Sequence, residues 1–139
     1  MEAPPLYEGR QPLGGGWWVV PPYPMAIREE DGSTVIWHSP RGLSLWISVY
    51  GADPGTTAAD TLEWVLSGRS EDAWDEIEEQ GPVLLRYGYR LDDSDAACPT
   101  FYGAAIAPDG GYALLGAYFE DEASLADAMA TWRSFEWKP

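Results

Sequence analysis

The sequence has little of what catalytic centres and covalent cross-links are built from. It holds one cysteine, Cys98, one histidine, His38, and one lysine, Lys138. A single cysteine excludes a disulfide within the chain, and a zinc site needs several His or Cys ligands at close spacing. The acidic run at 92–95 would raise the pKa of a nearby thiol, which is the wrong direction for a reactive thiolate. We therefore expect no nucleophilic catalysis, no metal and no cofactor.

Carboxylates could serve two further kinds of site, a calcium site and the active site of a hydrolase. The segment Asp92-Asp93-Ser94-Asp95 has side chains that calcium accepts, but it lacks the twelve-residue loop with its central Gly and terminal Glu, so a solvated loop is expected. Paired carboxylates could also serve a small hydrolase. With 23 acidic residues some close pairs are inevitable, so we keep this only as an alternative to a non-enzymatic function.

Basic residues are scarce as well. Eight Lys and Arg oppose 23 Asp and Glu, giving a formal net charge of −15. Nucleic-acid binding requires clustered cations against phosphate, and anionic membrane surfaces are disfavoured for the same reason. The chain shows no apolar run of the roughly 18 residues typical of a membrane span and no signal-peptide pattern. The expectation is a cytoplasmic protein.

Apolar and aromatic residues, in contrast, are plentiful. Hydrophobic residues make up 45% and aromatic residues 14% of the 139 positions, with eight Trp and eight Tyr. This supply is enough for a real core despite the charge. We predict an N-terminal flexible arm over 1–16, rich in Pro and Gly, and a single domain over 17–139.

Period-two patterns and turn residues predict seven strands. Asp31-Gly32 is a favoured tight-turn pair and 108–111 is a second turn. The clearest strand is Leu43–Tyr50, in which Leu43, Leu45, Ile47 and Val49 alternate with polar and aromatic residues. The predicted strands are 17–20, 25–30, 33–38, 43–50, 83–91, 101–107 and 112–119, with an acidic loop at 92–99.

Three segments are predicted as helices. Thr57 and Asp60 form a capping-box pattern before a helix that Gly68 ends. Ser70 is expected to cap a second short helix through Gln80, with Trp74 and Ile77 facing inward, and a last helix runs from about 121 to 135. We expect one core formed by the apolar faces of these elements: Leu43, Leu45, Ile47, Val49, Leu62, Leu66, Leu125, Met129 and Trp132.

Strands, helix, strands and helix in this order favour an α+β fold, an antiparallel sheet with helices packed on it. The order resembles the sandwich shared by PsbP-like proteins, the Ran-binding Mog proteins and Eag-type secretion chaperones. The likeness covers 17–137 and lies in the early strands that end at 43–50, the middle helix, the later strands and the terminal helix closing with 132–135. The resemblance implies a non-catalytic binding module and transfers no catalytic residue.

The segment 71–79 is the first candidate binding surface, because six of its nine residues are acidic. On the predicted helix these carboxylates crowd together, and such a field attracts a basic partner. Residues 71–139 also carry most of the charge, with 15 acidic and 4 basic residues. The candidate partner-binding acids are Glu71, Asp72, Asp75, Glu76, Glu78 and Glu79.

Aromatic residues provide the second candidate surface. Trp46 and Tyr50 lie on the strand face opposite the predicted core, and Trp and Tyr are favoured at interface hot spots. Small acidic bacterial proteins without catalytic motifs resemble immunity proteins that neutralise basic toxins, in kind rather than in fold.

The sequence therefore predicts an immunity or inhibitor protein for a basic toxin or enzyme. An Eag- or Mog-type chaperone or adaptor with an apolar sheet groove is the first alternative, and the carboxylate-dependent hydrolase is the second.

Overall fold

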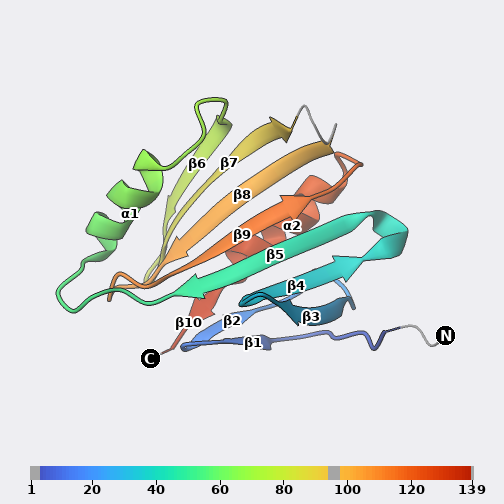
Figure 1. Ribbon diagram of the computed structural model, residues 1–139, viewed down its shortest axis with the longest axis horizontal. Coiled ribbons are helices and arrows are strands. Elements are labelled where there is room, and N and C mark those ends of the chain that lie inside the picture. The colour runs from blue at the N-terminus through green and yellow to red at the C-terminus, as the bar shows by residue number, and fades with distance from the viewer. Residues whose placement is uncertain (1–3, 94–97, 139) are drawn as a thin grey trace.

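The computed structural model describes residues 4–93 and 98–138 and has a mixed α+β fold (Figure 1). A seven-stranded antiparallel sheet has the strand order β3-β4-β5-β9-β8-β7-β6, and a small sheet has the order β1-β2-β10. The strands are β1 (Gln11–Gly14), β2 (Trp17–Val19), β3 (Ala26–Glu30), β4 (Ser33–His38), β5 (Leu43–Tyr50), β6 (Trp74–Gln80), β7 (Leu85–Asp93), β8 (Cys98–Ile106), β9 (Tyr112–Tyr118) and β10 (Glu136–Trp137). The helices are α1 (Ala58–Ser67), α2 (Ser124–Arg133) and the short 3-10 helix η1 (Ser39–Arg41).

The main strand and turn predictions are confirmed. Asp31 and Gly32 both have positive φ, 50° and 85°, as a tight hairpin turn requires. In the β5 strand Leu43, Leu45 and Ile47 are buried, as the alternation predicts.

Helix α1 begins where the sequence indicates. The Thr57 side chain accepts from the backbone N–H of Asp60, whose carboxylate accepts from that of Thr57, so the capping box is present. Gly68 is the C-cap residue.

The helix predicted over 70–80 is wrong, because this segment forms the edge strand β6. The backbone N–H of Ala73 donates to the carbonyl of Ser70 in a turn, and β6 then pairs with β7. On a helix its like charges would lie at i,i+4 spacing and repel one another. As a strand, the segment gains the ladder to β7 and sends successive carboxylates to opposite faces. Charged edge strands also discourage pairing with other chains.

Other boundaries differ less. Residues 11–14, expected in the N-terminal arm, form β1 and pair with β2. The acidic loop expected at 92–99 is shorter, since Asp92 pairs with Pro99 and Asp93 with Cys98, while 94–97 lie outside the described residues. Helix α2 starts at Ser124 rather than 121, because the Asp121 carboxylate accepts from the Ala123 N–H in a turn before the helix.

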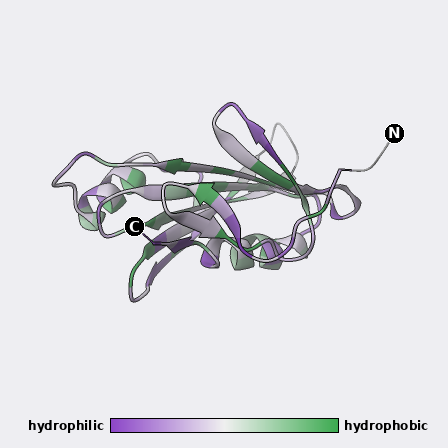
Figure 2. Ribbon diagram, turned by 90° about the horizontal axis from the view of Figure 1, so that it is seen from below, coloured by the Kyte–Doolittle hydropathy of each residue, from purple (hydrophilic) through white to green (hydrophobic). Residues whose placement is uncertain are grey.

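Helix α2 and the small sheet lie on the same side of the large sheet (Figure 2), and the core fills the space between them and the large sheet. Trp132 of α2 is fully buried, and its indole Nε1 donates to the carbonyl of Ala104, 3.0 Å away. A Cβ at Gly103 of β8 would lie 2.5 Å from the Trp132 ring, so only glycine allows this contact. Trp17 of β2 packs edge-on against Phe135, their ring centroids 6.2 Å apart.

The predicted core is confirmed except on α1. Val49, Leu125 and Met129 are partly buried against the core cluster. Leu62 and Leu66 are only half-buried and lie outside that cluster, because α1 contacts β7 and β8 from the other face of the sheet. Their helical spacing identified an amphipathic helix but not the face of the sheet it would cover.

Leu45→Ala should lower the free energy of unfolding by about 2–5 kcal/mol, because it removes a buried side chain and leaves a cavity. Urea denaturation of the variant measures this loss. The same substitution at half-buried Leu62 should cost less. A loss below about 0.5 kcal/mol at Leu45 would show that the buried face of β5 is assigned wrongly.

Gly103→Ala should destabilise the fold by about 1–3 kcal/mol, because its Cβ enters the space of the Trp132 ring. Gly116→Ala is the matched control within the neighbouring strand, since its Cβ would meet Tyr102 at an ordinary 3.4 Å. Thermal or urea unfolding compares the two variants. Equal costs would contradict the packing of α2 described above.

Candidate functional site

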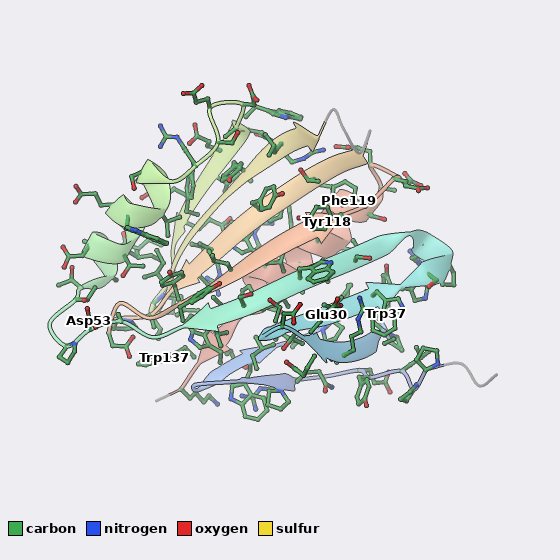
Figure 3. The ribbon with its side chains drawn as sticks, viewed as in Figure 1. Glu30, Trp37, Asp53, Tyr118, Phe119 and Trp137 are labelled. Atoms are coloured by element: carbon green, nitrogen blue, oxygen red, sulfur yellow. The ribbon has the colours of Figure 1, made fainter. Side chains whose placement is uncertain are left out.

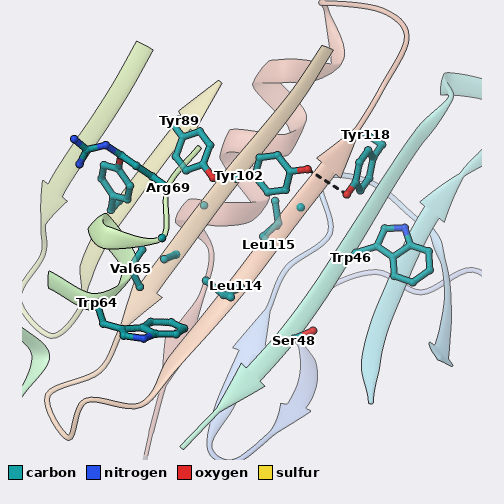
Figure 4. A pocket seen from close by; sticks show the side chains of 15 residues that line it. Trp46, Ser48, Trp64, Val65, Arg69, Tyr89, Tyr102, Leu114, Leu115 and Tyr118 are labelled. Carbon is teal, nitrogen blue, oxygen red and sulfur yellow. Dashed lines mark hydrogen bonds between the residues drawn. The ribbon is translucent and has the colours of Figure 1, made fainter. Parts of the chain in front are cut away.

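The face of the large sheet opposite α2 carries an aromatic groove of about 370 Å³ (Figure 4). Strand register explains which side chains meet there. Trp46 of β5 lies opposite Gly116 of β9, Gly116 opposite Tyr102 of β8, and Tyr102 opposite Tyr89 of β7. Paired residues share a face of a sheet, so these four form a row across four strands.

Small residues hollow out the floor of this groove. Gly116 separates the indole of Trp46 from the ring of Tyr102, and the next row contains Ser48, Leu114 and Ala104. Leucine, alanine and glycine leave space that the large rings at either side do not fill. The groove is therefore a gap between aromatic walls over a shallow apolar floor.

The tyrosines form a continuous line along the groove. Ring centroids are 5.9 Å apart for Tyr87 and Tyr89, 5.6 Å for Tyr89 and Tyr102, and 6.4 Å for Tyr102 and Tyr118. The hydroxyls of Tyr102 and Tyr118 lie 3.4 Å apart, as the dashed line in Figure 4 shows. Tyr87 is buried, and Tyr89, Tyr102 and Tyr118 are half-buried. Tyrosine combines an apolar ring with a polar hydroxyl, which suits protein interfaces.

Helix α1 forms the wall of the groove on the β7–β8 side. Trp64 and Val65 of α1 and Arg69, just beyond its end, line the groove, and Trp64 is 60% exposed. The buried Thr61 hydroxyl donates to the carbonyl of Gly110 at 2.7 Å, which ties the helix to the β8–β9 turn. Arg69 lies 3.4 Å from Glu76, so the cation in this wall is paired within the chain.

The structure places the aromatic candidates on this face but in different roles. Trp46 lines the groove and is 37% exposed. Tyr50 is 46% exposed and lies beyond the groove, where it stacks on Tyr112 with ring centroids 5.0 Å apart. Both have the outward direction that the alternation of 43–50 predicts.

The acidic candidates do not share one face, which corrects the expectation of a single acidic helix surface. Glu71 and Asp72 are exposed in the turn before β6, and Asp75 sits at an irregular position of the strand with φ 53°. The remaining three divide between the two faces of β6: Glu76 and Glu78 lie on the groove face, and Glu79 lies on the α2 face.

Two of these carboxylates have structural partners. Glu79 binds the guanidinium of Arg133 at 2.8 Å, and this hydrogen bond holds the pKa of Glu79 below its usual value. Glu76 accepts a hydrogen bond from the buried Tyr87 hydroxyl. Burial first, and then this bond, raise the pKa of Tyr87. Among the six acidic candidates, Glu71, Asp72, Asp75 and Glu78 are the exposed ones for which no ion pair is found in the described chain.

Most groove residues were not singled out from the sequence. Tyr89, Tyr102 and Tyr118 alternate with core residues as Trp46 does, so strand parity could have found them once the register was known. Trp64 carried no such signal, because the helical pattern pointed to Leu62 instead. Its position follows from tertiary packing alone.

His38 has an aromatic neighbour, and Cys98 is the first residue of β8. His38 ends β4 and packs edge-on against Tyr23, with ring centroids 4.8 Å apart. Within residues 4–93 and 98–138 no three His, Cys, Asp or Glu side chains gather as a metal would require. In the same residues no helix has the length and apolarity to cross a membrane.

No protein-family model matches the chain, and no curated protein matches it in sequence.

Tyr87→Phe should lower the free energy of unfolding by about 1 kcal/mol at pH 7, because it removes the bond to Glu76. The pKa of Tyr87 is higher in the folded than in the unfolded protein, so this stabilisation is complete below about pH 10 and is lost as the pH rises above that value. Urea denaturation of both proteins between pH 7 and 11 measures the difference. The other tyrosines are the same in both proteins, so their effect cancels in the difference between the two free energies of unfolding. A difference that stays constant from pH 7 to 11 would contradict the role given to Tyr87.

Proposed function

We propose that this chain is a non-catalytic binding domain that neutralises a basic toxin or enzyme, as an immunity or inhibitor protein, and that it binds this partner through the aromatic groove. The observation that carries the proposal is the groove itself, in which a line of buried and half-buried tyrosine rings lies between the exposed Trp46 and Trp64, on a sheet face that α1 covers only in part. Exposed Trp and Tyr in a hollow supply most of the binding energy at many interfaces.

Charge complementarity favours a basic partner. Five arginines form ion pairs with carboxylates of the same chain, so they are not free to meet an acidic partner. These pairs are Arg10–Glu136, Arg28–Glu30, Arg69–Glu76, Arg90–Glu122 and Arg133–Glu79. The net charge of −15 is then presented largely by unpaired carboxylates, which attract cationic surfaces and speed their association.

Acidic side chains also lie beside the groove. Glu78 of β6 pairs in register with Tyr87 and so shares its face of the sheet. Across the sheet, Glu30 of the β3–β4 hairpin, labelled in Figure 3, is paired with Arg28 at 2.8 Å. An apolar floor with charged surroundings matches the usual plan of a protein interface, a dry centre and a polar rim.

We propose that the fold is the PsbP/Mog-like sandwich, and the order of strands and helices supports this. That likeness, together with the apolar floor of the groove, favours one second candidate, a chaperone or adaptor of the Eag or Mog type that holds an apolar client segment. A carboxylate-dependent hydrolase is the remaining alternative, and the described residues that line the groove itself include no Asp or Glu.

The proposal predicts that immobilised chain captures a basic protein from native lysate and that Trp46→Ala weakens binding of that protein at least about tenfold. Trp74→Ala is the matched control, because Trp74 is 44% exposed on the opposite face, over the Arg90 guanidinium. Mass spectrometry identifies the captured protein, and calorimetry gives its affinity.

The outcomes separate the candidates. Affinity for a basic protein that falls steeply with added salt and depends on Trp46 supports the proposal. Affinity that depends on Trp46 but not on salt favours the chaperone. Enrichment of acidic proteins alone, or full affinity in Trp46→Ala, overturns the proposal.

A further inference from the structure

A second hollow adjoins the groove at the loop between β5 and α1. It has a volume of about 360 Å³, and Trp64 lines both spaces. Its other walls include Asp53, Asp60 and Tyr112. Figure 3 labels Asp53 in the loop that leads from β5 to α1.

Two aromatic rings line this hollow, and a third stacks on one of them. The Trp64 and Tyr112 ring centroids are 5.6 Å apart at an interplanar angle of 49°, and Tyr50 stacks behind Tyr112. Trp64 and Tyr50 are exposed, so ring faces remain open to solvent. Inclined aromatic faces around an open space are the arrangement that attracts cations through the negative face of each ring.

Negative charge accompanies these rings. The carboxylate of Asp60 accepts hydrogen bonds from Thr57 that hold its pKa below the usual value, so it is ionised at neutral pH. Asp53 is exposed in the loop. Neither acid has an ion-pair partner among the described residues.

Arginine stacking on aromatic rings recurs in this chain, but not at this hollow. Elsewhere its arginines stack on its own aromatic rings: Arg10 on Trp18, Arg28 on Trp37, Arg41 on Tyr23, Arg90 on Trp74 and Arg133 on Trp132. No Arg or Lys of the described chain lines the hollow at Trp64 and Tyr112. The hollow therefore has the aromatic rings and carboxylates that bind a guanidinium, but no guanidinium of the described chain lies in it.

We propose that the hollow binds one arginine side chain of the partner protein, whose guanidinium stacks on Trp64 and Tyr112 and faces Asp53 and Asp60. This inference rests on the proposed function. A planar guanidinium suits the site better than an ammonium, because it stacks on rings and pairs with carboxylates at its edge. Since Trp64 borders both spaces, the partner segment presents apolar residues to the groove and the arginine beside them.

The test uses a small probe and needs no partner. Nα-acetyl-arginine amide is titrated into the chain while the indole N–H signals are followed by NMR, with the Trp64 signal assigned from Trp64→Leu. The matched neutral probe is Nα-acetyl-citrulline amide, which has the same shape without the charge. The Trp64 signal should shift and saturate with arginine, and citrulline should bind about tenfold more weakly.

Two variants locate the binding. Asp53→Asn, a surface change in the loop before α1, should weaken arginine binding severalfold. Glu63→Gln changes an exposed acid of α1 that does not line the hollow, and it should leave binding unchanged. Equal binding of citrulline, no saturable shift of Trp64, or equal effects of the two variants overturns the inference. Because the probe needs no partner protein, failure here leaves the capture experiment intact, and failed capture beside specific arginine binding rejects only the proposed function.

Discussion

The contact between Trp132 and Gly103 is the interaction on which the rest of the structure depends. The fully buried indole lies directly over the backbone of β8, at a position where any side chain would collide with it. This contact fixes α2 at the centre of one face of the sheet, and the small sheet packs beside it. The face with the glycine therefore becomes the core, and the alternation of strands β5, β7, β8 and β9 sends Trp46 and the tyrosines to the other face.

The second face is left for a different use. Helix α1 covers only part of it, tied down by the bond between Thr61 and Gly110. Aromatic rings line the remaining groove, and Arg69 in its wall is paired with Glu76. A covered apolar face and an open aromatic face thus follow from the same strand periodicity, and the open face is the surface from which we infer partner binding.

The sequence predicted those parts of the fold that local chemistry decides. The alternation in 43–50 identified both faces of β5, and Thr57 with Asp60 marked the start of α1. It failed at 70–80, where helical and strand patterns compete. Residues 70–80 taken alone do not show that β7 lies beside them, and it is the hydrogen bonding to β7 that makes the segment a strand and not a helix. The groove was only half predictable for the same reason, since strand parity gives the direction of Trp46, but the approach of Trp64 depends on how α1 packs.

Oxidative footprinting of tryptophan side chains, in the free chain and in the complex with the captured basic protein, tests the central claim most directly. Trp46, Trp64 and Trp74 are all exposed in the free protein, so each should react there. In the complex, the account predicts that Trp46 and Trp64 become protected while Trp74, on the other face of the sheet, reacts as before. Protection of Trp74 with Trp46 and Trp64 still reactive would contradict it and would place binding at the acidic edge strand.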